Sequence, residues 1–378
     1  MLKARLTQLL DSHKRTTPST DPSPLRNVKD MQVGLVPLQR LDLHTKQIRI
    51  LRVLPGRYDD PIECELYTAH LGDRPYYEAL SYVWGDPTIC KPIFLEGREV
   101  QVTTNLRAAL RSLRLRDKIR HMWVDALCID QTDDIEKSHQ VNLMKIIYEQ
   151  TARALLWLGG LHKSRLFHGD NTHTTIGRRD ARNALKLILK IANAVEGSIG
   201  SLDALMGLSW WERIWTVQEA VLPHEATVSC GNLSLDWSTF IRAHRTLSLH
   251  ISHQCCLLRT RGSSYGLAPT RFAPCVSGIE ACRGPSLQLT GAFESHHRRK
   301  GGDSRDQLYA LLGLKTDWGG ELSTLVDYSV SPGEVFRKMT TVLIRLDDNL
   351  KPLTRLRQPS ADAYLPTWVH DLSATPLS

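Results

Sequence analysis

The stretch Trp123–Gly159, WVDALCIDQTDDIEKSHQVNLMKIIYEQTARALLWLG, decides the fold of this chain. It opens within an apolar run, MWVDALCI at Met122–Ile129, whose composition is typical of a parallel strand covered on both faces. An acidic loop follows, and apolar residues then recur at helical spacing. A second apolar run at Ala154–Leu158 is closed by two glycines. The stretch therefore predicts a strand, a crossover helix and a second, parallel strand.

Carboxylates gather around the end of the first of these strands: Asp125, Asp130, Asp133, Asp134 and Glu136. Asp133 precedes Glu136 by three residues, which resembles a capping box at the start of the helix. Ligands of open α/β sheets bind beyond the carboxyl ends of the strands, where this loop begins. Asp125 stands inside the apolar run, where a carboxylate is costly unless it is paired. We expect it to meet an arginine such as Arg213, a backbone donor or a metal.

Strands and helices alternate from Tyr77 to Ser229, which predicts an α/β fold with a parallel sheet and helices on both faces. Two segments upstream, Ile48–Leu54 and Ile62–Thr68, predict a β-hairpin added at the edge of this sheet. The other predicted elements are strands at Tyr77–Trp84, Glu99–Val102 and Ala226–Ser229, helices after Thr103, at Ala181–Val195 and through Trp210–Glu219, and a surface insertion at Leu161–Asp180.

The chain divides into three parts by composition and pattern. Residues 1–45 form a basic leader that we expect to be flexible, residues 46–230 the α/β domain, and residues 231–378 a mainly helical C-terminal extension. Within the extension, Asp306–Leu314 and Pro332–Leu346 have helical patterns. Ser252–Lys300 has no clear period, so a poorly ordered or looped segment is expected near residues 251–302.

Charge and composition exclude several classes of function. The 378 residues carry a net charge of +8, but Met1–Arg57 holds 11 Lys and Arg against 4 Asp and Glu, so the rest of the chain is nearly neutral. That distribution argues against a dedicated nucleic-acid binder. No run of about 18 apolar residues predicts a membrane helix. The cysteines stand in apolar contexts without CxxC pairs, which indicates free thiols in a reducing compartment.

Three blocks of sequence resemble a known family: YEALSYVWGD at Tyr77–Asp86, the stretch Trp123–Gly159, and WWERIWTVQEA at Trp210–Ala220. Together they are similar to the fungal heterokaryon-incompatibility (HET) domain. SRDQLYALLGL at Ser304–Leu314 and DYS at Asp327 extend the resemblance, whereas Ile251–Gly302 departs from it. The resemblance implies a cytoplasmic allorecognition module, comparable to innate immunity, that triggers growth arrest or cell death when genetically unlike fungal cells fuse.

The HET family is itself similar to Toll/interleukin receptor (TIR) domains, and the order of predicted elements agrees with that comparison. SYVWGD falls where a TIR domain has its first strand and acidic loop. Trp215 and Glu219 stand four residues apart, as do the tryptophan and the catalytic glutamate of TIR domains that cleave NAD. The resemblance thus implies a TIR-like or flavodoxin-like sheet, Glu219 as the candidate catalytic residue and NAD as a candidate substrate.

One carboxylate suffices for that chemistry. Cleavage of the nicotinamide ribosyl bond passes through an oxocarbenium-like state, which a glutamate in a dry pocket would stabilise, and the leaving group departs neutral. No other cofactor and no metal are predicted. The candidates for the rest of the pocket are aromatic residues that could stack on the base and carboxylates at strand ends: Trp84, Asp86, Asp125, Asp130 and Trp215.

Each of these residues also has a purely structural alternative. Glu219 could be a solvated carboxylate on a helix, and the tryptophans at Trp210–Trp215 could belong to the core. Ser81 in its strand suggests packing rather than a nucleophile. The loop Asp130–Glu136 could hold magnesium, although helix capping and solvation explain most of its acids.

The sequence therefore predicts a HET-type cell-death effector with three alternatives for its mechanism. The first is hydrolysis of NAD through Glu219. The second is a non-enzymatic adaptor that acts by self-association, as a homo-oligomer or with other incompatibility-signalling proteins. The third is a metal-dependent hydrolase built on the Asp130–Glu136 loop. Neither nucleic acid nor a membrane is an expected partner.

Overall fold

The computed structural model describes residues 38–162, 174–193, 200–252, 268–284, 287, 289–314, 326–347, 365 and 369. Most of the leader predicted at residues 1–45 lies outside these ranges, as does the middle of the insertion predicted at Leu161–Asp180. The described strands are β1 (Gln47–Val53), β2 (Glu63–His70), β3 (Glu78–Tyr82), β4 (Cys90–Leu95), β5 (Arg98–Thr103), β6 (Arg120–Trp123), β7 (Arg153–His162), β8 (Thr175–Gly177), β9 (Ala226–Cys230) and β10 (Leu233–Asp236).

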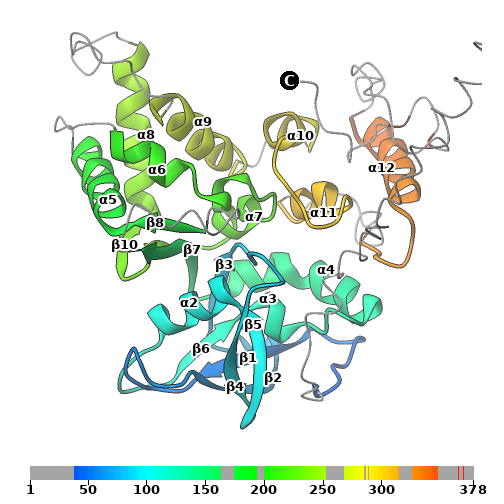
Figure 1. Ribbon diagram of the computed structural model, residues 1–378. Helices are drawn as coiled ribbons and strands as arrows, with labels where there is room; N and C mark the ends of the chain where they lie inside the picture. The colour runs from blue at the N-terminus through cyan, green and yellow to red at the C-terminus, as the bar shows by residue number, and fades with distance from the viewer. Residues whose placement is uncertain are drawn as a thin grey trace, which may run out of the picture.

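One mixed sheet joins these strands in the order β10-β9-β7-β3-β6-β1-β2-β4-β5, with β8 paired to β7 (Figure 1). Its centre is parallel, because the neighbouring strands β6, β3, β7 and β9 pair in parallel with one another. Numbered along the chain, these four strands have the spatial order 2-1-3-4, the order of flavodoxin-like sheets. The α/β fold predicted from the sequence is confirmed. Such a sheet binds ligands where the strand order reverses, beyond the carboxyl ends of β3 and its neighbours.

The helices and 3-10 turns follow the strands and extend into the C-terminal region. None of the described helices is both long and apolar enough to span a membrane. Their bounds are η2 (Leu71–Asp73), α2 (Thr104–Leu113), α3 (Asp125–Cys128), α4 (Asp134–Gln150), α5 (Arg178–Ala192), α6 (Gly200–Met206), η3 (Ser209–Glu212), α7 (Thr216–Val221), α8 (Trp237–Ser252), α9 (Ala268–Ala281), α10 (Leu289–His296), α11 (Asp306–Leu312) and α12 (Pro332–Asp347).

Helices cover both faces of the parallel centre. Ser81 of β3 pairs in register with Leu156 of β7, so both side chains point to one face, and Trp157 points to the other. The Trp157 indole donates to Asn105 of α2 over 3.0 Å, whereas Ser81 donates to Glu219 of α7. α2 and α7 therefore lie on opposite faces, as the alternation of strands and helices predicted.

The strand that opens the acidic stretch is shorter than predicted. β6 ends at Trp123, and Asp125–Cys128 forms the short helix α3. The amide of Cys128 donates to the Val124 carbonyl over 2.8 Å, so the chain turns away from the sheet at once. The prediction that the strand runs through Met122–Ile129 is therefore wrong beyond Trp123. Asp125 consequently stands at the carboxyl end of a strand and not within it.

The helix after the acidic loop begins as predicted. Asp133 caps α4, because its Oδ1 accepts hydrogen bonds from the amides of Ile135 and Glu136 at 2.9 and 3.2 Å. The reciprocal half of a capping box is missing, since the Glu136 carboxylate binds Arg49 instead, at 2.6 and 2.9 Å. This buried pair joins α4 to β1.

The N-terminal hairpin lies inside the sheet and not at its edge. β1 pairs antiparallel with β2 on one side and with β6 on the other. A second hairpin, β4–β5, which connects β3 to α2, pairs with β2 and forms the edge. The edge position predicted for Ile48–Leu54 and Ile62–Thr68 is therefore wrong, because β4–β5 adds outside them through the pairing of β4 with β2.

The tryptophan-rich segment is not one helix. η3 ends at Glu212 and α7 begins at Thr216, and the residues between them are extended enough to form a bridge from Arg213 to Lys300. The amide of Ile214 donates to the Lys300 carbonyl over 2.9 Å instead of to a helical partner. The prediction of one continuous helix is wrong because this long-range contact replaces local hydrogen bonds.

Helices also form where the sequence predicted loops. α9 and α10 occupy much of Ser252–Lys300, and residues 253–267 lie outside the described ranges. Phe272, Val276 and Ile279 do recur at helical spacing and are fully buried, and Phe272 packs on Phe240 of α8 with ring centroids 6.2 Å apart. Pro274 within the helix obscured that period. The predicted helices at Asp306–Leu314 and Pro332–Leu346 are confirmed as α11 and α12.

Candidate functional site

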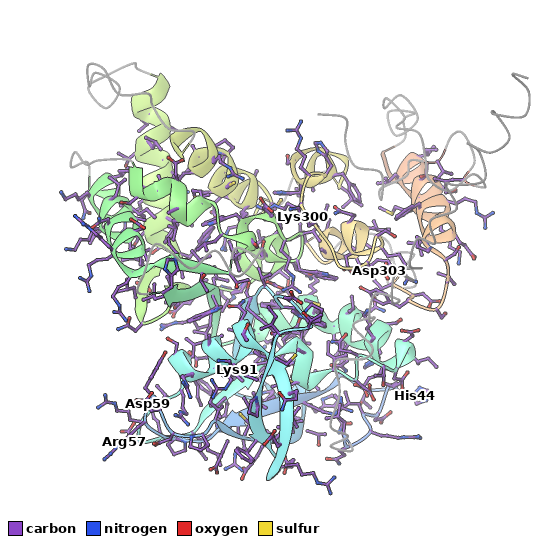
Figure 2. The ribbon with its side chains drawn as sticks, viewed as in Figure 1. His44, Arg57, Asp59, Lys91, Lys300 and Asp303 are labelled. Atoms are coloured by element: carbon purple, nitrogen blue, oxygen red, sulfur yellow. The ribbon has the colours of Figure 1, made fainter. Side chains whose placement is uncertain are left out.

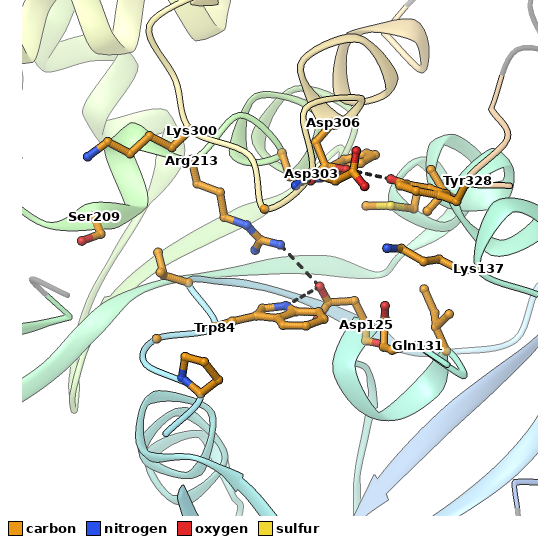
Figure 3. Close-up of a pocket in the computed structure, with 18 of the residues that line it drawn as sticks. Trp84, Asp125, Gln131, Lys137, Ser209, Arg213, Lys300, Asp303, Asp306 and Tyr328 are labelled. Carbon is orange, nitrogen blue, oxygen red and sulfur yellow. Dashed lines mark hydrogen bonds and ion pairs between the residues drawn. The ribbon is translucent and has the colours of Figure 1, made fainter. Parts of the chain in front are cut away.

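A cavity of about 560 Å³ lies beyond the carboxyl ends of β3 and β6, next to the reversal of strand order between β3 and β7 (Figure 3). Volumes of this size accommodate drug-sized ligands. Four parts of the described chain supply its walls: the end of β3, the segment from α3 into α4, the segment from η3 to the start of α7, and the C-terminal residues Lys300, Gly302, Asp303, Asp306 and Tyr328. The polar and aromatic lining residues are Trp84, Asp125, Gln131, Lys137, Ser209, Glu212, Arg213, Trp215, Lys300, Asp303, Asp306 and Tyr328.

Trp84, Asp125 and Trp215 line this cavity, so three of the predicted pocket residues come together. Asp125 is held from both sides. Its Oδ2 accepts from the Trp84 indole over 2.8 Å and lies 3.5 Å from the Arg213 guanidinium, and its Oδ1 accepts from the amide of Ala126. The anticipated pairing of Asp125 with Arg213 is confirmed. A partly exposed, oriented carboxylate therefore faces the cavity.

Two predicted pocket residues do not line the cavity. Asp86 accepts from both the amide and the hydroxyl of Thr88, and Asp130 does the same with Thr132. These are local turns in which the aspartate side chain replaces a backbone acceptor. Both residues shape the loops that follow β3 and α3, and their carboxylates are turned toward their own backbone.

Glu219 is 2% exposed, so the alternative of a solvated surface carboxylate is wrong. Its Oε2 accepts a short hydrogen bond from the Ser81 hydroxyl, which itself accepts from the Trp210 indole over 2.9 Å. Its Oε1 lies 3.8 Å from the Arg213 guanidinium. Burial raises the pKa of Glu219 to about 7, against the opposing effects of Arg213 and the Ser81 hydrogen bond. Glu219 is not among the residues that line the cavity and lies behind Arg213.

Arg213 connects the two carboxylates. Its guanidinium lies between Asp125 and Glu219 and donates a short hydrogen bond to the Tyr82 carbonyl at the end of β3. Burial alone would lower the pKa of Arg213, but the charges of Glu219 and Asp125 more than reverse that effect. The three side chains thus form one charge network that reaches from the cavity wall into the core.

The C-terminal region fixes the loop that carries Arg213. Arg299 donates to the Arg213 carbonyl over 3.1 Å and to the Thr216 hydroxyl over 2.9 Å, and Lys300 binds the Glu212 carboxylate over 2.8 Å. Figure 2 shows Lys300 and Asp303 between the C-terminal helices and the sheet. Residues far apart in the sequence therefore complete one cavity, which explains why sequence reasoning missed the contribution of this region.

Several lining residues were not predicted: Gln131, Lys137, Lys300, Asp303, Asp306 and Tyr328. Two short sequence motifs indicated two of these residues. The segments SRDQ at Ser304 and DYS at Asp327 extended the family resemblance, and Asp306 and Tyr328 belong to these segments. The hydroxyl of Tyr328 donates to Asp306 over 2.7 Å, so the two segments meet at the cavity.

Three acids of the Asp130–Glu136 loop already have partners within the protein. Glu136 is paired with Arg49 and accepts from the Asp130 amide over 2.7 Å, Asp133 caps α4, and Asp130 closes a turn. Within the described residues, no group of three or more His, Cys, Asp or Glu side chains is placed to hold a metal ion. The metal-dependent alternative therefore loses the ligand set on which it rested.

Comparison with known proteins identifies the domain around this cavity. Residues 77–219 match the family model described as Heterokaryon incompatibility protein (HET). This segment is therefore similar to the HET domain. It is also 26% identical over 396 aligned residues to Heterokaryon incompatibility protein 6, OR allele, of Neurospora crassa. That alignment covers 85% of this chain and 57% of the relative, so the chain spans little more than half the relative's length.

No solved structure matches the chain significantly, so the resemblance to TIR domains stays a prediction. The matched HET domain contains Trp84, Asp125, Arg213 and Glu219, and it ends before the segment that supplies Lys300 and Tyr328. The HET domain alone therefore provides only part of the cavity wall.

Proposed function

We propose that this protein acts in heterokaryon incompatibility and that its HET domain does so by hydrolysing NAD in the cavity. The incompatibility role is suggested by the HET match and by the name of the Neurospora relative. The observation that favours an enzyme is the Asp125–Arg213–Glu219 network beside an aromatic-lined cavity at the carboxyl ends of β3 and β6. Buried titratable groups of raised pKa concentrate at catalytic sites.

In this proposal Asp125 acts directly on the substrate, because it is the carboxylate of the network that faces the cavity. It would stabilise the ribosyl cation while nicotinamide leaves as a neutral molecule. Water then attacks the anomeric carbon and loses a proton, so the products are nicotinamide, ADP-ribose and one proton. Glu219 is a positioning residue, since its carboxylate and Ser81 fix the Arg213 guanidinium that holds Asp125.

A second function is favoured by the burial of Glu219. Both of its oxygens are engaged inside the protein, as expected of a residue that only stabilises the fold. On that basis the protein would be an adaptor that triggers cell death through self-association or other signalling proteins, with no chemistry in the cavity.

Expression in fungal cells separates the two functions. For the enzyme we expect growth arrest together with a fall in cellular NAD. Glu219→Gln should lose both, because glutamine keeps the Ser81 contact but cannot take on the negative charge that Glu219 gains as pH rises through about 7. The full chain should be used, and a thermal melt must show that the variant is folded. Arrest with undiminished NAD would favour the adaptor, and undiminished NAD loss in Glu219→Gln would remove Glu219 from the mechanism.

A further inference from the structure

Lys137 stands out among the charged residues of the cavity. It lies in the first turns of α4, and its ammonium group points into the cavity between Tyr328 on one side and Asp125 and Gln131 on the other (Figure 3). The Nζ atom is 4.1 Å from the centre of the Tyr328 ring. A cation–π contact of this kind orients an ammonium group without neutralising it.

The other cations of the cavity already have carboxylate partners. Arg213 lies 3.5 Å from Asp125, and Lys300 lies 2.8 Å from Glu212. Among the described residues, no carboxylate approaches Lys137 within ion-pair distance, so the cavity contains one cation without a counter-ion from that part of the chain.

Asp303 and Asp306, the two cavity acids whose pKa Lys137 lowers, are bound to other groups. Asp303 binds the Arg305 guanidinium at 2.6 Å, and Asp306 accepts from the Tyr328 hydroxyl at 2.7 Å and from the Asp303 amide at 3.0 Å. The positive charge of Lys137 still favours the ionised forms of Asp303 and Asp306 through space, without a direct contact. These acids are thus bound to Arg305 and Tyr328, and the ammonium group of Lys137 points into the cavity.

We propose that Lys137 is the anion-binding residue of the cavity and that it takes a phosphate group of a nucleotide. A half-buried ammonium group is best satisfied by an anion, and lysine binds phosphate as a compact point charge. The volume of about 560 Å³ leaves room for the rest of a nucleotide. The identification of that anion as a nucleotide phosphate rests on the proposed function, whereas the anion site itself rests on Lys137 and its surroundings.

The contact with Tyr328 makes the proposed anion site depend on the C-terminal region. It lies beyond the matched HET domain, so the C-terminal region would hold the phosphate-binding lysine in place. Tyr328→Leu removes the ring that contacts the ammonium group and should weaken phosphate binding less than loss of the Lys137 charge does.

Binding of ADP and of adenosine to the full-length protein, measured by equilibrium dialysis, tests the proposal. We expect wild-type protein to bind ADP more tightly than adenosine, with an affinity that falls as salt rises. Lys137→Met keeps the apolar stem and should weaken ADP binding by at least about tenfold, while adenosine binding is unchanged. Lys137→Arg should retain the preference for ADP.

Lys145→Met is the matched control, because Lys145 lies on the same helix, pairs with Glu149 and does not line the cavity. Equal ADP binding by wild type and Lys137→Met, or no preference of the wild type for ADP over adenosine, would overturn the proposal. The outcome is separable from the proposed function: if NAD is not consumed but ADP binds through Lys137, the hydrolase fails and the phosphate site stands.

Discussion

Arg49→Met should lower the free energy of unfolding by about 3–5 kcal/mol, one of the two largest stability effects we expect. Arg49 and Glu136 are 2% and 7% exposed, and the guanidinium makes two bonds to the carboxylate. It also donates to the carbonyls of Cys128 and Gln39, so β1, α3 and α4 meet on this side chain. Without it, the Glu136 charge is buried and unpaired. Urea unfolding monitored by circular dichroism measures the change.

The control lies on the same strand. Arg52 pairs with Glu65 at 2.5 Å, but both side chains are more than a third exposed, at 37% and 39%. Arg52→Met should therefore change stability by at most about 1 kcal/mol. Adding Glu136→Met to Arg49→Met should restore part of the lost stability, because it removes the unpaired charge. Similar losses for Arg49→Met and Arg52→Met would show that the buried pair has no special role.

The second large effect is a change in how stability depends on pH. Burial raises the pKa of Glu219 to about 7, from an ordinary value of 4.5. Between these values the folded protein keeps a proton that the unfolded chain releases. Relative to a protein with an unshifted glutamate, this proton stabilises the folded state fully below about pH 4.5. The free energy of unfolding then falls by roughly 3 kcal/mol as pH rises from 4.5 through 7. Glu219→Gln cannot titrate, so wild type should lose stability relative to this variant between pH 5 and pH 8.

Free energies of unfolding of both proteins at pH 5 and pH 8 measure this difference directly. Glu149→Gln serves as the control, because Glu149 is exposed and paired with Lys145 at the surface, and its pH profile should follow that of the wild type. Parallel profiles for wild type and Glu219→Gln would mean that Glu219 stays ionised throughout this range. Arg213 would then be paired with two negatively charged carboxylates, Asp125 and Glu219.

The parts of the fold that were predictable from sequence are those that local patterns determine. Thr103 caps α2, Asp133 caps α4, and Ala154–Leu158 belongs to a central parallel strand, as the spacing of apolar and capping residues indicated. The domain family was also recognisable, because its motifs are long. Local patterns failed at Asp125, where an apolar run continues past the end of β6 into a helical turn.

The parts that could not be predicted depend on contacts between distant segments. Lys300 pairs with the loop at Arg213 and breaks what local propensity would make a single helix. Tyr328 contacts Lys137 although the two residues are far apart in the sequence, and no local sequence pattern predicts that contact. For the same reason Glu219 was recognised as a special residue by its motif, but its place behind Arg213 required the tertiary structure.

The rate of NAD consumption by purified full-length protein, compared between Asp125→Asn and Asp86→Asn, tests the central claim most directly. Both aspartates were candidates from sequence, but only Asp125 lines the cavity, whereas Asp86 closes a turn with Thr88 that asparagine can also form. We predict that Asp125→Asn lowers the rate by about 100-fold or more and that Asp86→Asn stays near the wild-type rate. Absence of NAD consumption by the wild type, or equal rates for wild type and Asp125→Asn, would contradict the account.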